Sequence, residues 1–299
     1  MSERENEMRP SSRLLFITLI FITSALFVSG CKDNITSPAE TLTVLDDAAE
    51  SVASAVGEEN GGTSDQIADI VDLASGFGIR TGFLGVPIVG VRADTGIYDP
   101  LTGWWTVTIN RSRSSDDGRF SASFTRIYKY QFLNASGISQ RWYITNGDTA
   151  RTVKMQTLEG SGSHRTPRLS HTLVSVTSDM TLTNAHRDTI TINGTTSRQA
   201  VDTLSSLNAT RIAETVISIQ LTDVRSIKAR PLQRVRMGEG ISGTISGRFQ
   251  GEFTFIRGDL YNERSVDRTF TITLGGDDPS INMGSRRFGF IPGWGQIRP

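Results

Sequence analysis

Apolar and polar residues alternate along the chain from about Trp105 onward, and this period of two constrains the fold more than any other feature. Residues 120–133 show it most clearly, with mostly serine, threonine, lysine and glutamine at the odd positions. The even positions hold Phe120, Ala122, Phe124, Arg126, Tyr128, Tyr130 and Phe132. Because successive side chains of a strand point to opposite faces, this alternation indicates a strand with one buried and one solvated face.

The same alternation recurs in residues 174–182, 190–192, 217–221, 241–255 and 270–274. Short sequences rich in glycine, asparagine and aspartate separate these stretches, for example Asp116-Asp117-Gly118, Asn146-Gly147-Asp148 and Asn193-Gly194. Turns of this kind, without helical patterns between the strands, predict antiparallel pairing. In residues 241–255 glycines alternate with isoleucine and phenylalanine on one side, which predicts a bent strand or the close approach of another layer.

Two helices are expected before the strands. The first covers residues 40–56, and the second begins at Ser64, whose hydroxyl could cap free backbone amides, and ends before Gly76. Each has an apolar stripe, formed by Leu45, Ala49, Val52 and Val56 in the first and by Ile67, Ile70, Val71 and Ala74 in the second. Such short amphipathic helices are expected to pack on the sheet that follows.

The chain is therefore predicted to be mainly β. We expect about ten to twelve strands in one large curved antiparallel sheet, either a sandwich or a partly open barrel, with the two N-terminal helices packed on it. The helices in residues 40–76 and the β domain in residues 77–299 should form one unit.

The N-terminal residues have the polarity of an export signal. Arg9 and Arg13 precede fifteen uncharged, mainly apolar residues, 14–28, and small residues follow. This stretch is shorter than the roughly 18 apolar residues that a membrane-spanning helix needs. The only cysteine, Cys31, follows the two small residues Ser29 and Gly30.

The sequence Val28-Ser29-Gly30-Cys31 resembles the lipobox of bacterial lipoproteins. The resemblance implies that residues 1–30 are a signal peptide, and that Cys31 becomes an acylated N-terminus carrying lipid such as palmitate. Lys32 in place of aspartate implies sorting to the outer membrane, on its periplasmic or its outer side. Residues 31–39 would then be a lipidated tether to the membrane.

The charge balance excludes some partners. The chain has 31 basic and 31 acidic residues, so it has no excess of positive charge that would favour binding to nucleic acid. No cofactor motif is present, and no metal site is expected. The two aspartates Asp277 and Asp278 are too few for the roughly six to eight oxygens that calcium takes.

No catalytic constellation stands out. Asp94-Thr95-Gly96 matches the aspartic-protease tripeptide but has no second copy, so a turn is expected. Residues 160–164, Gly-Ser-Gly-Ser-His, resemble a nucleophile elbow without a following helix and are expected to form a flexible loop. His164, His171 and His186 have spacings unlike those of a metal site, and all three are expected to be ordinary exposed residues.

Trp104 and Trp105 begin a strand, so their side chains must face opposite ways. One should belong to the core, and the other could contact a ligand or partner at a rim.

The sequence thus predicts a lipid-anchored cell-envelope protein, without evident catalysis, that acts as a structural or interaction module. A carrier of lipid or another apolar ligand, with a curved sheet around a helix, is the alternative, and a hydrolase is a distant third.

Overall fold

A computed structural model describes residues 38–58, 61–76, 78–79, 96–167, 169–205, 209–228, 241–275, 278–291 and 295–298. The chain divides into two units after Glu40, and apart from the first residues of one helix everything described belongs to the second unit, Thr41–Pro299. The signal peptide, Cys31 and most of the expected tether lie outside the described residues.

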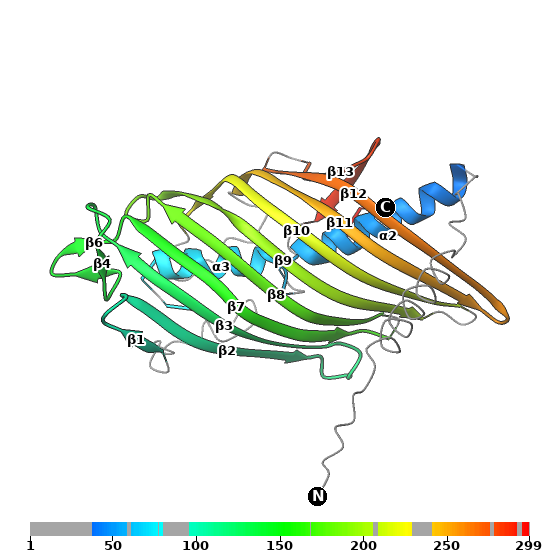
Figure 1. Ribbon diagram of the computed structural model, residues 1–299, viewed down its shortest axis with the longest axis horizontal. Coiled ribbons are helices and arrows are strands. Elements are labelled where there is room, and N and C mark those ends of the chain that lie inside the picture. Colours follow the sequence, from blue (N-terminus) through cyan, green and yellow to red (C-terminus); the bar gives the residue numbers. More distant parts are fainter. Residues whose placement is uncertain are drawn as a thin grey trace, which may run out of the picture. The chain divides into compact units, whose positions relative to one another are not determined.

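Thirteen of the described strands form one antiparallel sheet (Figure 1). The strands are β1 (Ile97–Asp99), β2 (Trp104–Ser114), β3 (Ser121–Leu133), β4 (Ser139–Gln140), β7 (Thr152–Arg165), β8 (Leu169–Thr183), β9 (Thr189–Ser205), β10 (Thr210–Ile227), β11 (Ile241–Arg257), β12 (Leu260–Leu274), β13 (Ser280–Met283), β14 (Arg286–Ile291) and β15 (Gln296–Ile297). A separate hairpin contains β5 (Ile144–Thr145) and β6 (Asp148–Thr149).

The topology is a meander. Each long strand pairs with the one before it in the chain, and only the β4–β6 insertion interrupts the order. The path runs from β1 at one edge to β15 at the other without pairing between them, so the sheet is curved but not closed. This confirms the predicted fold class and favours the partly open barrel over a sandwich.

The alternating pattern is confirmed for most strands. In β3 every even position from Ala122 to Phe132 is buried, and the expected apolar positions of β9, β10 and β12 are buried as well. Val174 is an exception, because it is 52% exposed whereas Leu173 is buried. A bulge between Leu173 and Ser175 shifts the alternation of β8 by one residue.

Residues 160–164 are not the loop that we predicted. They continue β7, with Gly162 opposite Phe124 of β3 and His164 opposite Ala122. A Cβ atom at Gly162 would lie 2.2 Å from Cδ1 of Phe124, so the glycine makes room for an aromatic side chain. Gly247 of β11 makes room in the same way for Phe270, its partner on β12, so the close neighbour at this glycine is the adjacent strand of the same sheet and not another layer.

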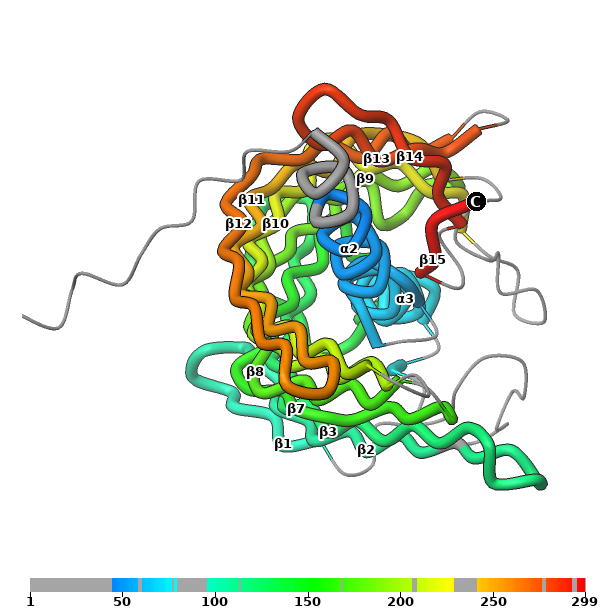
Figure 2. Tube along the Cα trace, turned by 90° about the vertical axis from the view of Figure 1, so that its right-hand side faces the viewer, coloured from blue at the N-terminus to red at the C-terminus, as the bar shows by residue number. Residues whose placement is uncertain are grey.

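Helix α2 (Pro38–Val56) begins two residues before the predicted start, and α3 (Thr63–Ala74) one residue before it. Ser64 is not the cap, because the N-cap residue is Gly62, which has no side-chain hydrogen bond. Figure 2 shows both helices inside the curve of the sheet, where the predicted apolar stripe of α3 joins the sheet's buried side chains in one core cluster. Among the described residues, no helix is both long enough and apolar enough to cross a membrane.

Candidate functional site

Charged side chains are buried between α3 and the concave face of the sheet. Asp65 and Asp69 are four residues apart on α3, so they lie on the same side of the helix. Arg111 of β2 and Arg126 of β3 lie opposite them, and all four residues are no more than 5% exposed. Arg126 occupies an even, inward-facing position of β3, which the sequence pattern otherwise gives to apolar residues.

Hydrogen bonds connect this group, which we call the α3 ion cluster, together with Tyr128. Arg111 Nη1 donates to both oxygens of Asp65, at 2.9 and 2.8 Å, and Arg111 Nη2 donates to Asp69. Arg126 Nη1 donates to Asp65 Oδ2 at 2.6 Å, and its Nη2 donates to the carbonyl of Gly61. The Tyr128 hydroxyl donates to Asp69 Oδ2 at 2.8 Å.

The charges in the cluster balance. Burial by itself would lower the pKa of Arg111, but the facing carboxylates of Asp65 and Asp69 raise it well above its ordinary value. Burial also raises the pKa of Tyr128, so the phenol keeps its proton and remains a donor. Two guanidinium groups thus neutralise two carboxylates away from water, and the arrangement fixes α3 in one position on the sheet.

The prediction that His164 and His171 are exposed is wrong. They are 5% and 2% exposed, and their rings lie 5.4 Å apart between centroids. The two residues belong to different strands and form a directly opposed pair of β7 and β8, so their side chains share a face. A turn separates them along the chain, so their spacing in the sequence does not show that they face each other. His186 is exposed, as predicted.

Both ring nitrogens of His171 have partners. Nδ1 lies 2.6 Å from Oδ1 of Asp202, and Nε2 lies 3.1 Å from Nη2 of Arg198. Because a guanidinium group can only donate, Nε2 must accept and Nδ1 carries the proton that is donated to Asp202. Arg198 also donates to the carbonyl of Ala55 at 2.9 Å, near the C-terminal end of α2.

The environment of these groups disfavours additional positive charge. Burial, and then the neighbouring His171, lower the pKa of His164 to about 4. Burial also lowers the pKa of Arg198 to about 10, which still leaves the guanidinium protonated at neutral pH. His164 is therefore neutral under ordinary conditions, and no hydrogen-bond partner for its Nδ1 lies among the described residues.

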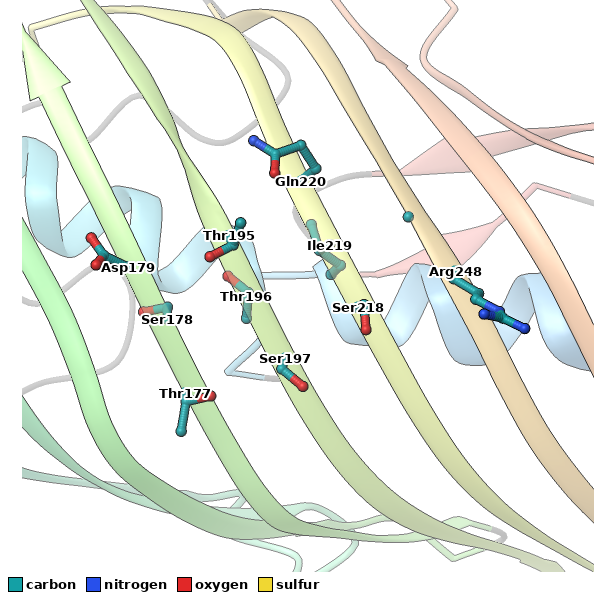
Figure 3. Close-up of a pocket in the computed structure, with 11 residues that line it drawn as sticks. Thr177, Ser178, Asp179, Thr195, Thr196, Ser197, Ser218, Ile219, Gln220 and Arg248 are labelled. Atoms are coloured by element: carbon teal, nitrogen blue, oxygen red, sulfur yellow. The ribbon is translucent and has the colours of Figure 1, made fainter.

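An open groove of about 510 Å³ crosses β8 to β11 (Figure 3). The exposed residues that line the groove alternate along their strands with the buried core residues, so they face away from the helices. These exposed residues are Thr177, Asp179, Thr195, Ser197, Ser218, Gln220 and Arg248. Two of its charges already have partners, because Asp179 accepts from Gln156 and Arg248 pairs with Asp267. The groove thus offers mainly hydroxyl and amide groups to a partner.

The tryptophan pair divides between two faces of β2. Trp105 is 4% exposed and donates from Nε1 to the carbonyl of Arg141 at 2.7 Å, so it belongs to the core. Trp104 is half-buried on the other face. The exposed tryptophan at this end is instead Trp142, which is 50% exposed, with the Arg141 guanidinium 5.1 Å from its ring centroid.

The other predicted positions provide no assembled site. Cys31, Asp94, Thr95 and Asp277 lie outside the described residues. Asp278 is paired with Arg287 and Arg298. Within the part of the chain that the structure describes, no group of three or more histidine, cysteine, aspartate or glutamate residues is arranged to hold a metal ion.

Sequence reasoning missed the α3 ion cluster, although the pattern contained a usable indication. An arginine at an inward position of an alternating strand requires a buried partner, and Arg126 is such a residue. Two carboxylates one helical turn apart, Asp65 and Asp69, are a suitable pair of partners.

No protein-family model, curated protein or solved structure matches the chain.

Proposed function

We propose that this protein is a lipid-anchored component of a bacterial cell envelope that works as a structural or interaction module through the outer face of its sheet. The anchor would be the acylated Cys31, within the lipobox-like sequence Val28-Ser29-Gly30-Cys31. We expect the lipid to anchor the protein in the outer membrane. The residues between Cys31 and α2 would form the tether, so α2 would be the first folded element after the lipid.

The single observation that carries the module role is the occupied concave face. Side chains of both helices and of the sheet form one buried cluster there, and the α3 ion cluster ties α3 to β2 and β3. The space that the described residues show where α2 meets β8 to β11 measures about 80 Å³. Apolar ligand sites usually measure several hundred Å³, roughly 300 or more. The exposed outer face, with its polar groove, is the surface that supports contact with partners.

Acylation of Cys31 has a direct test. In a bacterial host grown with radiolabelled palmitate, the protein should incorporate label, and the Cys31→Ser variant should incorporate none because it lacks the thiol. The label is measured after immunoprecipitation and electrophoresis. Equal label in both proteins would overturn the anchor. A Ser29→Thr variant keeps Cys31 and serves as the control for expression and export.

The occupied concave face has a separate test, which distinguishes the module from the carrier. Native mass spectrometry of the Cys31→Ser protein purified from its host should give the mass of the chain alone, since the helices already fill the space that a lipid would need. A stoichiometric lipid adduct that survives gentle desolvation would contradict the module role and favour the carrier.

A further inference from the structure

The β11–β12 hairpin ends in a group of exposed apolar side chains. Leu260 and Tyr261 are 67% and 63% exposed, and Phe255 and Ile256 are each 37% exposed. Ile256 pairs with Tyr261 across the hairpin, and Phe255 and Leu260 belong to the opposite face of the same two strands. We call these four residues the hairpin tip. Exposed apolar side chains that lie together mark contact sites for proteins or membranes when the patch is large enough.

The hairpin tip lies at the end of the sheet toward which the N-terminal half of α2 points. Asp47 of α2 forms an ion pair with Arg211 of β10, and Arg211 pairs directly with Phe255 of the tip. In the other direction, α3 ends near the opposite end of the sheet, where Gly76 lies against Tyr143.

The length of the chain limits how far the proposed lipid anchor can lie from Asp47. Nine residues separate Asp47 from the start of α2 at Pro38, a helical distance of about 14 Å. The seven residues 31–37 can add at most about 24 Å. The turn of the hairpin lies only three residues beyond Phe255, about 10 Å farther along the strand. A membrane that holds the acyl chains is therefore within reach of the hairpin tip.

The chemistry of the tip suits a lipid surface. Tyr261 combines an apolar ring with a hydroxyl, which donates to Glu263, and tyrosine is common where one end of a side chain is apolar and the other is wet. Arg257 and Asp259 flank the turn with opposite charges. These two charges cancel, and the carboxylate beside Tyr261 is that of Glu263. The tip therefore has no excess of positive charge, and its attraction to a membrane should come from apolar contact and not from anionic lipid.

We propose that the hairpin tip inserts into the surface of the membrane on which the lipid anchor holds the protein. The proposal rests on the acylation of Cys31. Four side chains make a weak contact on their own, but an anchor turns the contact into an intramolecular one with an effective concentration in the millimolar range. The second contact would restrict the orientation of the domain and leave the opposite end of the sheet, with Trp142, facing away from the lipid.

An environment-sensitive fluorophore tests this contact. Since Cys31 is the only cysteine and would be acylated, Leu260→Cys introduces the one free thiol, which is labelled with the dye NBD. In phosphatidylcholine vesicles, the emission of the acylated protein labelled at position 260 should shift to shorter wavelength and be quenched by nitroxide lipids. The matched control is Leu101→Cys, a 95% exposed position in the turn between β1 and β2, which should show neither effect.

The test also separates this proposal from the anchor itself. The Cys31→Ser chain with an N-terminal histidine tag, held on vesicles by nickel-chelating lipid, replaces the acyl group with an artificial tether. The same shift at position 260, and its absence at position 101, is expected there even if palmitate labelling has failed. Identical spectra at positions 260 and 101 on the tethered protein would overturn the membrane contact, whether or not Cys31 is acylated.

Discussion

Replacing Asp69 by alanine is expected to lower the free energy of unfolding by about 3–5 kcal/mol. The substitution removes the acceptor for Arg111 Nη2 and for the Tyr128 hydroxyl, and it leaves two buried guanidinium groups facing the single carboxylate of Asp65. Water cannot compensate, since Asp69 is fully buried. Urea unfolding of the Asp69→Ala protein, followed by circular dichroism, measures the loss.

Asp267→Ala is the matched control. Asp267 also forms a two-bond pair with an arginine, Arg248, but both side chains are about half exposed. A surface pair of this kind contributes at most about 1 kcal/mol. If Asp69→Ala and Asp267→Ala changed stability by the same small amount, the α3 ion cluster would not be what holds α3 on the sheet.

The free energy of unfolding is expected to fall by roughly 3 kcal/mol as the pH drops from 6.5 to about 4. In the unfolded chain His164 takes up a proton below its ordinary pKa of 6.5, whereas in the folded protein burial and then His171 lower that pKa to about 4. Between these values the unfolded state binds more protons. This contribution is therefore fully present above pH 6.5 and is lost as the pH falls toward 4.

The groups around His164 explain why it resists protonation. His171 of β8 and the Arg198 cation of β9 oppose a positive charge, and Asp202 of β9 favours one but is already engaged with His171. Urea unfolding at a series of pH values measures the effect as the difference between the wild type and His164→Phe, which keeps an aromatic ring that cannot titrate. The pKa of His186 is also lowered, by burial and then by Arg151, but less than that of His164, so His186→Phe should change the profile less than His164→Phe does. Superimposable profiles for the wild type and His164→Phe would refute the expectation.

The sequence was sufficient for the fold because the alternation in residues such as 120–133 directly reports which face of a strand is buried. It failed at Val174 because a bulge changes the alternation without any change in composition. The strand formed by residues 160–164 was missed for a related reason. Glycine and serine there suggested a loop, but the glycines are needed where Phe124 and Val176 press against β7.

The buried polar groups were harder to predict, since they depend on pairs that are distant in sequence. Nothing local to His164 shows that it will oppose His171, because that requires the register of β7 and β8. Likewise, 61 residues separate Arg126 from Asp65. The alternation along β3 could identify Arg126 as a charged residue that faces the core, but only the packing of α3 identifies its partners.

The meander order of the strands has a consequence for how the chain acquires its structure. Since each long strand pairs with its predecessor, most loops to be closed are short, and pairing can proceed in the order of synthesis. The contacts of α3 with β2 and β3 span 42 to 61 residues, so they are available early. The bond between Asp46 and Arg286 spans 240 residues. Helix α2 therefore gains its last attachment only when the C-terminal strands arrive, and α3 is secured long before it.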